Sequence, residues 1–420
     1  MTPGSSGFAK EGESTTQLLS LLVSAVAEQY LRTLTSTLNV EVGTVLKIPV
    51  VPLPDQLTEI ASECIEISKW DWDNTESSWD YQRNSVLGIP ANRDTLESVV
   101  RHWQAECTNR IASLASLEQE NNRLLVDEYD VDVELDPEVE LKHVTLFCNA
   151  PYRYDDDKSE SELESLLLAD TMREFISYAV GCMLGRYSLD KPGLILANQG
   201  ETADDYRQQI PEPTFTPDED NVIPLLDGDW FTDDISERFK EFLKVTFGTE
   251  HFDENLTFLE NALYPDNLTG KKRKTIRDYF LKEFYNHHIK LYKKRPIYWL
   301  FSSPKGTFNA LIYMHRYRSD TVSVVLNGYL REFQTKLRGK LEQLQHVADI
   351  GDASKAEKTK ALKTIETLNK QLKELEDYER DILFPLAQEQ IEIDLDDGVK
   401  VNYNKFGSAL KKVTGLTGKV

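Results

Sequence analysis

Cysteine is scarce in this chain, and its residues are widely spaced. The four are Cys64, Cys107, Cys148 and Cys182. No two of them form a Cys-x-x-Cys pair, which argues against a zinc site and against a disulfide framework. Such sparse cysteine is typical of a protein in a reducing compartment, so we expect a cytoplasmic location and no metal site.

Long apolar runs are also missing. No stretch of about 18 apolar residues occurs, so we expect no membrane-spanning helix and no membrane partner. Residues 1–15 lack a basic region followed by an apolar core, and no signal peptide is predicted there. The sequence therefore favours a cytoplasmic protein over a secreted or membrane-bound one.

Positive charge is in deficit, because 48 Lys and Arg residues stand against 71 Asp and Glu residues. The net charge of -23 would by itself repel nucleic acid. The deficit is reversed between Lys271 and Arg318, where 13 Lys and Arg residues face only Asp278 and Glu283. The local charge is +11, which leaves -34 on the other residues.

The basic segment 271–318 interleaves its cations with Tyr and Trp residues. Lys and Arg bind phosphates, and aromatic rings stack on sugars or bases, so the segment predicts an interface for DNA. The alternative is a solvated basic face that balances acidic neighbours in the same fold. The predicted DNA-binding residues are Lys271, Lys272, Arg273, Lys274, Arg277, Lys293, Lys294, Arg295, Lys305, Arg316 and Arg318.

The hydrophobic pattern predicts an α+β protein that is predominantly α-helical, with several helical subdomains. Short strands are predicted around a turn within residues 39–54 and again at 143–149, and a β-hairpin is predicted around Ser303-Pro304-Lys305-Gly306. From residue 321 onward, leucines at steps of three and four predict an antiparallel, coiled-coil-like helical hairpin with a turn near Gly351.

Four domains are predicted. A proline-rich, acidic stretch at 197–229 marks the clearest boundary between them. The predicted domains are residues 1–54, residues 55–198 with acidic loops, residues 199–320 with the linker and the basic β-hairpin, and residues 321–420 with the helical hairpin and tail.

Two motifs that adenine methylation requires are absent. No glycine-rich turn after a strand is present to bind S-adenosylmethionine. Asn149-Ala150-Pro151-Tyr152 resembles the Asn-Pro-Pro-Tyr loop that holds a flipped adenine, but Ala150 replaces the first proline and acidic loops flank it. We therefore predict a structural turn there, and no catalytic, cofactor-binding or metal-binding residue in this chain.

Five stretches carry a resemblance to a known family. They read LNVEVGTVLKIPV, CIEISKWDWDNTESSWDY, ISYAVGCMLGRYSLDKPGLIL, YNHHIKLYKKRPIYWLFSSPKGTFNALIYMHRY and IDLDDGVKVNYNKFGSAL. In this order they resemble the C-terminal part of PglX, the large adenine-specific DNA methyltransferase of BREX phage-defence systems. That family is itself related to single-chain type II restriction-modification methyltransferases.

The resemblance implies a function that the whole enzyme performs. A full-length member transfers methyl from S-adenosylmethionine to adenine N6 within a short DNA site. This chain would be its C-terminal DNA-engaging and scaffolding portion, inactive alone, with DNA, an N-terminal methyltransferase half and other BREX proteins as partners. No catalytic residue carries over, because no position here matches one.

Two other interpretations stay open at this point. The helical hairpin is compatible with a protein–protein adaptor of a defence complex. The net charge of -23 is compatible with an acidic DNA mimic, although mimicry requires acids over a continuous face and the basic segment argues against that.

Overall fold

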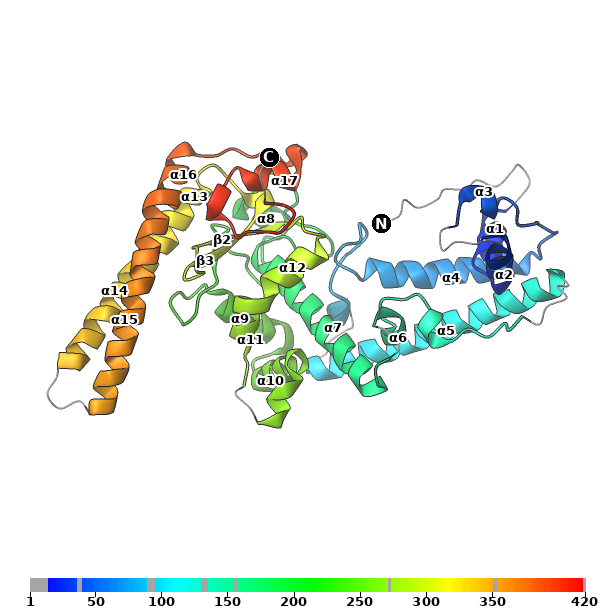
Figure 1. The fold of residues 1–420 in the computed structure, drawn as a ribbon, viewed down its shortest axis with the longest axis horizontal. Coiled ribbons are helices and arrows are strands. Elements are labelled where there is room, and N and C mark those ends of the chain that lie inside the picture. Colours follow the sequence, from blue (N-terminus) through cyan, green and yellow to red (C-terminus); the bar gives the residue numbers. More distant parts are fainter. Residues whose placement is uncertain are drawn as a thin grey trace. The chain divides into compact units, whose positions relative to one another are not determined.

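The computed structural model describes residues 14–35, 40–88, 95–129, 135–154, 157–270, 273–349 and 354–417. The described chain is predominantly helical and contains a small three-stranded antiparallel sheet (Figure 1), which confirms the predicted class. Two compact units are present. Unit 1 comprises Met1–Trp79 and Ser98–Leu168, and unit 2 comprises Asp80–Glu97 and Ala169–Val420. The four predicted domain bounds stay a prediction.

No helix in the described ranges combines the length and the apolar character that crossing a bilayer requires.

Unit 1 is built from helices around two apolar cores. Its helices are α1 Thr15–Leu22, α2 Ala25–Leu34, α3 Val42–Val45, α4 Gln56–Asp73, most of α5 Leu96–Tyr129, the 3-10 turn η2 Leu141–His143, α6 Ala150–Arg153 and the start of α7 Glu160–Met183. Serine side chains cap the first two helices, because Ser14 accepts from the backbone of Gln17 and Ser24 from that of Ala27. One core contains Leu21, Leu57 and Leu125, and the other contains Cys107, Val144 and Cys148.

The strands predicted within 39–54 and at 143–149 are wrong. The first range contains the helical turn α3 and irregular chain with three prolines, which cannot donate to a sheet ladder. In the second range Val144 and Leu146 are buried in alternation, as in a strand. However, the Phe147 and Cys148 N–H groups donate to the carboxylate of Asp71, at 2.6 and 3.0 Å. These two groups therefore bond to a side chain and not to a neighbouring strand.

Unit 2 surrounds the sheet with helices. The strands are β1 Ile223–Pro224, β2 Tyr298–Ser302 and β3 Asn309–Tyr313, in the order β1-β3-β2 and all antiparallel. The helical elements that follow α7 are α8 Ala203–Gln209, α9 Ile235–Phe247, α10 Phe252–Leu263, η3 Pro265–Thr269, α11 Ile276–Tyr279, η4 Phe280–Phe284, α12 Tyr285–Leu291, η5 Met314–Arg316, α13 Thr321–Val324, η6 Val325–Leu330, α14 Arg331–Asp349, α15 Lys355–Tyr378, η7 Glu379–Leu383, α16 Phe384–Glu389, η8 Leu395–Asp397, α17 Gly398–Asn404 and η9 Gly407–Ala409. The predicted β-hairpin is confirmed as β2 and β3.

The short segment 80–97 is held inside unit 2 by residues that lie far along the chain. The Leu96 N–H donates to the side-chain oxygen of Asn255 at 2.8 Å, and the Gly193 N–H donates to the Gln82 carbonyl at 2.7 Å. Tyr81 packs against the rings of Tyr178 and Tyr187. Unit 2 is therefore assembled from two separate stretches of sequence.

Helices α14 and α15 pack side by side (Figure 1). Arg331 pairs with Glu379 at 2.7 Å and Arg338 pairs with Glu376 at 2.9 Å, so that the two helices run in opposite directions. Leu337 and Leu368 are buried between them. The predicted turn near Gly351 lies outside the described residues, and coiled-coil packing along the whole hairpin stays a prediction.

A buried carboxylate joins this hairpin to the sheet. Glu374 of α15 accepts hydrogen bonds from the Ser303 hydroxyl at 2.6 Å, the Lys305 backbone N–H at 2.7 Å and the Thr307 hydroxyl at 2.6 Å. These donors all belong to the turn between β2 and β3, which the carboxylate therefore holds in place.

Candidate nucleic-acid interface

The structure draws several of the predicted DNA-binding residues into the fold. Arg316 is 3% exposed, and its guanidinium donates to the backbone carbonyls of Leu184, Asp218 and Glu219 at 2.8 to 3.2 Å. Its role is to satisfy carbonyls in the interior of unit 2. These bonds engage the two terminal nitrogens of the guanidinium within the fold, while its Nε has no hydrogen-bond partner among the described residues.

Arg277 also makes its contacts within unit 2. Its guanidinium donates to the carbonyls of Leu226 and Gly228 and pairs with Asp229 at 2.5 Å and Asp234 at 3.1 Å. Asp234 is almost completely buried, so that Arg277 compensates its negative charge. The contacts of Arg277 favour the alternative interpretation, in which a basic side chain balances acids of the same fold.

The other residues of the basic segment are divided between internal contacts and the surface. Arg273 pairs with the buried Glu260 at 3.0 Å. The Lys274 ammonium lies 4.6 Å from the ring centroid of Tyr264. Arg318 pairs with Asp320 at 3.0 Å. The Lys305 side chain is exposed at the β2–β3 turn. Lys271 and Lys272 lie outside the described residues.

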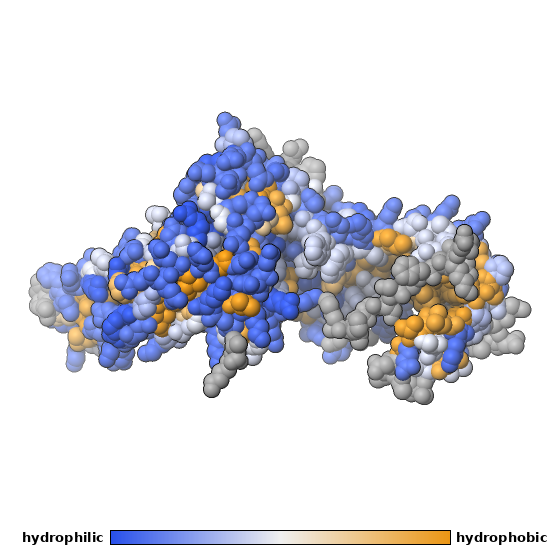
Figure 2. Space-filling model, turned by 90° about the horizontal axis from the view of Figure 1, so that it is seen from above, coloured by the Kyte–Doolittle hydropathy of each residue, from blue (hydrophilic) through white to orange (hydrophobic). Residues whose placement is uncertain are grey.

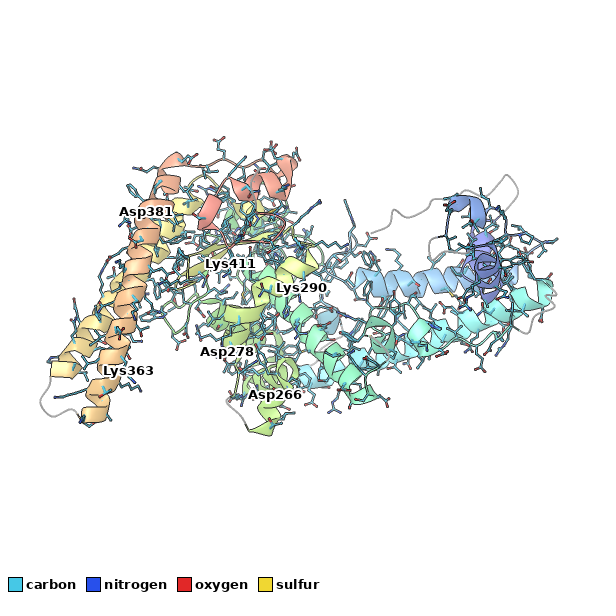
Figure 3. The ribbon with its side chains drawn as sticks, viewed as in Figure 1. Asp266, Asp278, Lys290, Lys363, Asp381 and Lys411 are labelled. Carbon is cyan, nitrogen blue, oxygen red and sulfur yellow. The ribbon has the colours of Figure 1, made fainter. Side chains whose placement is uncertain are left out.

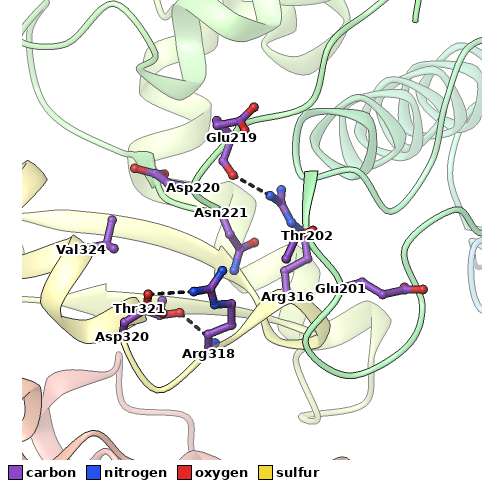
Figure 4. A pocket seen from close by; sticks show the side chains of 10 residues that line it. All are labelled: Glu201, Thr202, Glu219, Asp220, Asn221, Arg316, Arg318, Asp320, Thr321 and Val324. Carbon is purple, nitrogen blue, oxygen red and sulfur yellow. Dashed lines mark hydrogen bonds and ion pairs between the residues drawn. The ribbon is translucent and has the colours of Figure 1, made fainter. Parts of the chain in front are cut away.

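A pocket of about 200 Å³ lies beside Arg316 in unit 2 (Figure 4). Its lining mixes both charges: Glu201, Thr202, Glu219, Asp220, Asn221, Arg316, Arg318, Asp320, Thr321 and Val324. Figure 4 shows Arg316 donating to the backbone carbonyl of Glu219 and Arg318 paired with the carboxylate of Asp320, so that the second bond joins opposite side-chain charges and the first does not. Among the described residues, no group of three or more His, Cys, Asp and Glu side chains could hold a metal ion.

Burial raises the pKa of Asp218, next to this pocket, to about 7; nearby Asp220 adds to the rise and Arg316 opposes it. Because the pKa is higher in the folded than in the unfolded state, this carboxyl stabilises the fold fully below about pH 4, and the contribution is lost as the pH rises to 7. We expect Asp218→Asn, which stays neutral, to gain stability relative to the parent protein across that window.

The expected gain is at most roughly 1.4 kcal/mol for each pH unit between 4 and 7. Urea unfolding of both proteins at pH 5 and pH 8 measures it. Asp320→Asn, at an exposed ion pair, is the control for replacing a carboxyl by an amide. An equal difference between Asp218→Asn and the parent at both pH values would show that Asp218 titrates normally.

Three consecutive predicted residues lie together at the surface. Lys293, Lys294 and Arg295 are exposed in the turn after α12, and none makes an ion pair with another described residue. Lys290, in the last turn of α12, shares these properties. The turn therefore presents consecutive cations without compensating acids.

The C-terminal segment adds cations to the same region. It runs antiparallel along β2, with Leu410 bridged to Phe301 and the Lys411 N–H donating to the Leu300 carbonyl at 2.8 Å. Farther along, Gly415 approaches the Lys294 side chain, since a β-carbon placed there would lie 3.6 Å from Cδ and 3.8 Å from Nζ. Lys411 and Lys412 are exposed and have no described ion-pair partner.

We refer to six residues as the cationic surface: Lys290, Lys293, Lys294, Arg295, Lys411 and Lys412 (Lys290 and Lys411 are labelled in Figure 3). Sequence reasoning selected three of them. It missed Lys290, which lies inside the basic segment, and the Lys411-Lys412 pair, whose proximity depends on the pairing of the C-terminal segment with β2.

The turn that carries these cations has an unusual backbone. Lys293 and Lys294 have φ angles of 51° and 65°, in the left-handed region where glycine is favoured and other residues are strained. The turn is held by the Lys294 N–H, which donates to the Ile289 carbonyl at 2.8 Å. Two lysines thus occupy positions where glycine would cost less, and such strain is found preferentially at functional sites.

The turn at Asn149 is fixed by hydrogen bonds within unit 1. The Asn149 side chain is 2% exposed, and its amide donates to the carbonyls of Leu141 and Val144, both at 2.7 Å. These bonds fix the amide inside unit 1, where it cannot reach an adenine. The aromatic Tyr152 that follows is instead exposed.

Comparison with known proteins finds similarity to adenine-specific methyltransferases. The chain is 35% identical over 393 residues to the adenine-specific methyltransferase BrxX of Escherichia coli O9:H4 (strain HS), a match that covers 91% of this chain and 32% of that protein. It is also 35% identical over 422 residues to the adenine-specific methyltransferase PglX of Lacticaseibacillus casei (strain Zhang), covering 98% of this chain and 33% of that protein. No family model matches the chain.

The chain is therefore PglX-like in sequence over nearly its whole length, which confirms the resemblance predicted from the five stretches. It spans about a third of the length of the curated relatives that it matches.

Proposed function

We propose that this chain is the DNA-engaging and scaffolding part of a site-specific adenine methyltransferase in BREX phage defence. Methyl transfer from S-adenosylmethionine to adenine N6 would take place in a methyltransferase part that this chain does not contain. The proposal is supported by similarity to two adenine-specific methyltransferases, together with a surface suited to a nucleic-acid backbone.

One observation carries the DNA-binding half of the proposal, namely the cationic surface. Six exposed Lys and Arg side chains lie there without an acidic partner among the described residues, although the chain carries a net charge of -23. Cations that have no internal partner are available for phosphates, whereas Arg277 and Arg316 are engaged within the fold. We therefore propose a DNA interface that differs from the whole basic segment and consists of the turn after α12 and the C-terminal segment.

Replacing Lys294 by glycine tests this assignment. Glycine accepts a φ of 65° without strain, so we expect the melting temperature to stay the same or rise. Loss of one phosphate contact should weaken DNA binding roughly threefold to tenfold and make the log–log salt dependence shallower by about 0.9. Fluorescence anisotropy with a duplex at several salt concentrations measures both quantities.

The matched control is Gln390→Gly, which relieves another exposed left-handed residue, with a φ of 50°, but removes no charge. This control should leave DNA affinity unchanged. If Lys294→Gly bound DNA as tightly as the parent, with the same salt slope, the cationic surface would have no role in binding phosphate.

A further inference from the structure

Unit 1 exposes a set of large apolar side chains on its first three helices and on the chain that flanks them. We name it the apolar face: Leu19, Leu22, Val23, Leu34, Val40, Val42, Leu46 and Val50. Leu46 and Val23 are the most exposed of these, at 79% and 69%. Figure 2 shows apolar side chains gathered over the part of the chain that holds α1 to α3.

Helix α1 shows why this face is not an ordinary surface. Leu21 lies in the core of unit 1 and is almost completely buried, whereas Leu19 and Leu22 point away from that core and are 40% and 45% exposed. A helix at the surface of a globular protein normally has one apolar side and one polar side. A helix that is apolar on both sides is typical of one that is buried on both sides.

The apolar face is also poor in charge. Residues 14–54 contain only Glu28, Arg32, Glu41 and Lys47, although charged residues make up 28% of the chain. Glu28 and Arg32 pair with one another at 2.6 Å. Depletion of charge at the centre of an apolar patch distinguishes protein–protein interfaces from the rest of a protein surface.

We propose that the apolar face binds the methyltransferase part of a PglX-like protein, as the permanent contact between that part and this chain. This inference rests on the proposed function. It is supported by the relatives, which are about three times as long as the matched region, so that most of a PglX-like polypeptide lies outside it. Large apolar interfaces with few charges are typical of such permanent contacts.

The composition of the face disfavours other occupants. Nucleic acid and anionic lipid headgroups both require cations, and Lys47 is the single cation of residues 14–54 that has no described ion-pair partner. Val42 and Leu46 lie one helical turn apart in and after α3, so that together they form an aliphatic ridge for a complementary apolar groove.

Co-expression tests the proposal. The full chain, carrying an affinity tag, is expressed together with the portion of the Lacticaseibacillus casei PglX that lies outside the match. We expect a stable complex between them. The double variant Val42→Asp/Leu46→Asp should weaken it at least about tenfold, because two charges would be desolvated at the contact. Both positions are well exposed, so the isolated variant should fold normally, which circular dichroism checks.

The matched control is Leu268→Asp, at a 74% exposed leucine of η3 in unit 2, which should leave the complex intact. The proposal is overturned if the parent chain captures nothing, if the double variant binds as well as the parent, or if the face instead mediates self-association or adsorption to phosphatidylglycerol vesicles. DNA binding by the double variant separates the two proposals: it should equal that of the parent, because the cationic surface is unchanged.

Discussion

Reversing the charge of Lys293, Lys294 and Arg295 to Glu should weaken binding of duplex DNA roughly 100-fold or more at low salt. These residues supply half of the cationic surface, and the three new acids would add to a net charge of -23. The log–log salt slope should become shallower by about 2 to 3, since each lost phosphate contact removes about 0.9. Duplexes of unrelated sequence should be affected equally, because phosphate contacts carry no base information.

A matched charge change elsewhere provides the control. Lys355, Lys360 and Lys363 are exposed lysines of α15, and reversing all three to Glu changes the net charge by the same amount. If this triple variant loses as much affinity as the first, the effect comes from the overall field of the protein. Loss confined to the first variant identifies a local contact, and loss in neither variant would contradict DNA binding by this surface.

Leu337→Asp is expected to have the largest effect on stability. Leu337 is 1% exposed in the contact between α14 and α15, so that an aspartate there would bury a charge without a partner. The expected cost is roughly 3 kcal/mol or more. For a unit of this size that lowers the melting temperature by roughly 6 to 12 °C, which differential scanning fluorimetry detects.

Leu362→Asp is the control for this change. Leu362 belongs to α15 but is 58% exposed, and an aspartate there remains hydrated. Its melting temperature should stay within about 2 °C of the parent value. Equal melting of Leu337→Asp and the parent would show that this contact does not stabilise the hairpin, and a coiled-coil seam would be ruled out.

Local patterns in the sequence were sufficient to predict some elements of the fold. The β-hairpin followed from alternating apolar residues around Ser303–Gly306, and both strands pair as expected. Alternation at 143–149 gave the wrong result, since burial of Val144 and Leu146 occurs without a neighbouring strand. There the ladder is replaced by a carboxylate, Asp71, more than 70 residues earlier. Periodicity in the sequence indicates which side of a segment is buried, but it does not indicate which groups form hydrogen bonds with the backbone of that segment.

The basic segment illustrates the same limit for the candidate site. Sequence shows that cations are clustered, yet whether each is free depends on distant partners. Arg277 meets Asp229 across 48 residues, and Arg316 meets the Leu184 carbonyl across 132 residues. Conversely, Lys411 joins the surface only because its backbone pairs with Leu300. Long-range pairing of this kind has no signal in a single sequence.

The two-part origin of unit 2 has a consequence for its synthesis on the ribosome. The Leu96 N–H has no acceptor until Asn255, which lies 159 residues later in the chain, has been synthesised. At roughly 5 to 20 residues per second, that interval lasts about 8 to 30 s. Tyr81 and Gln82 can meet Tyr178 and Gly193 earlier in this interval, but the Leu96 N–H still has no acceptor. Unit 1, which needs only residues up to Leu168, can already mature. Nascent chains arrested between Gly193 and Asn255 should therefore be cut by proteases near Leu96 and spared in unit 1.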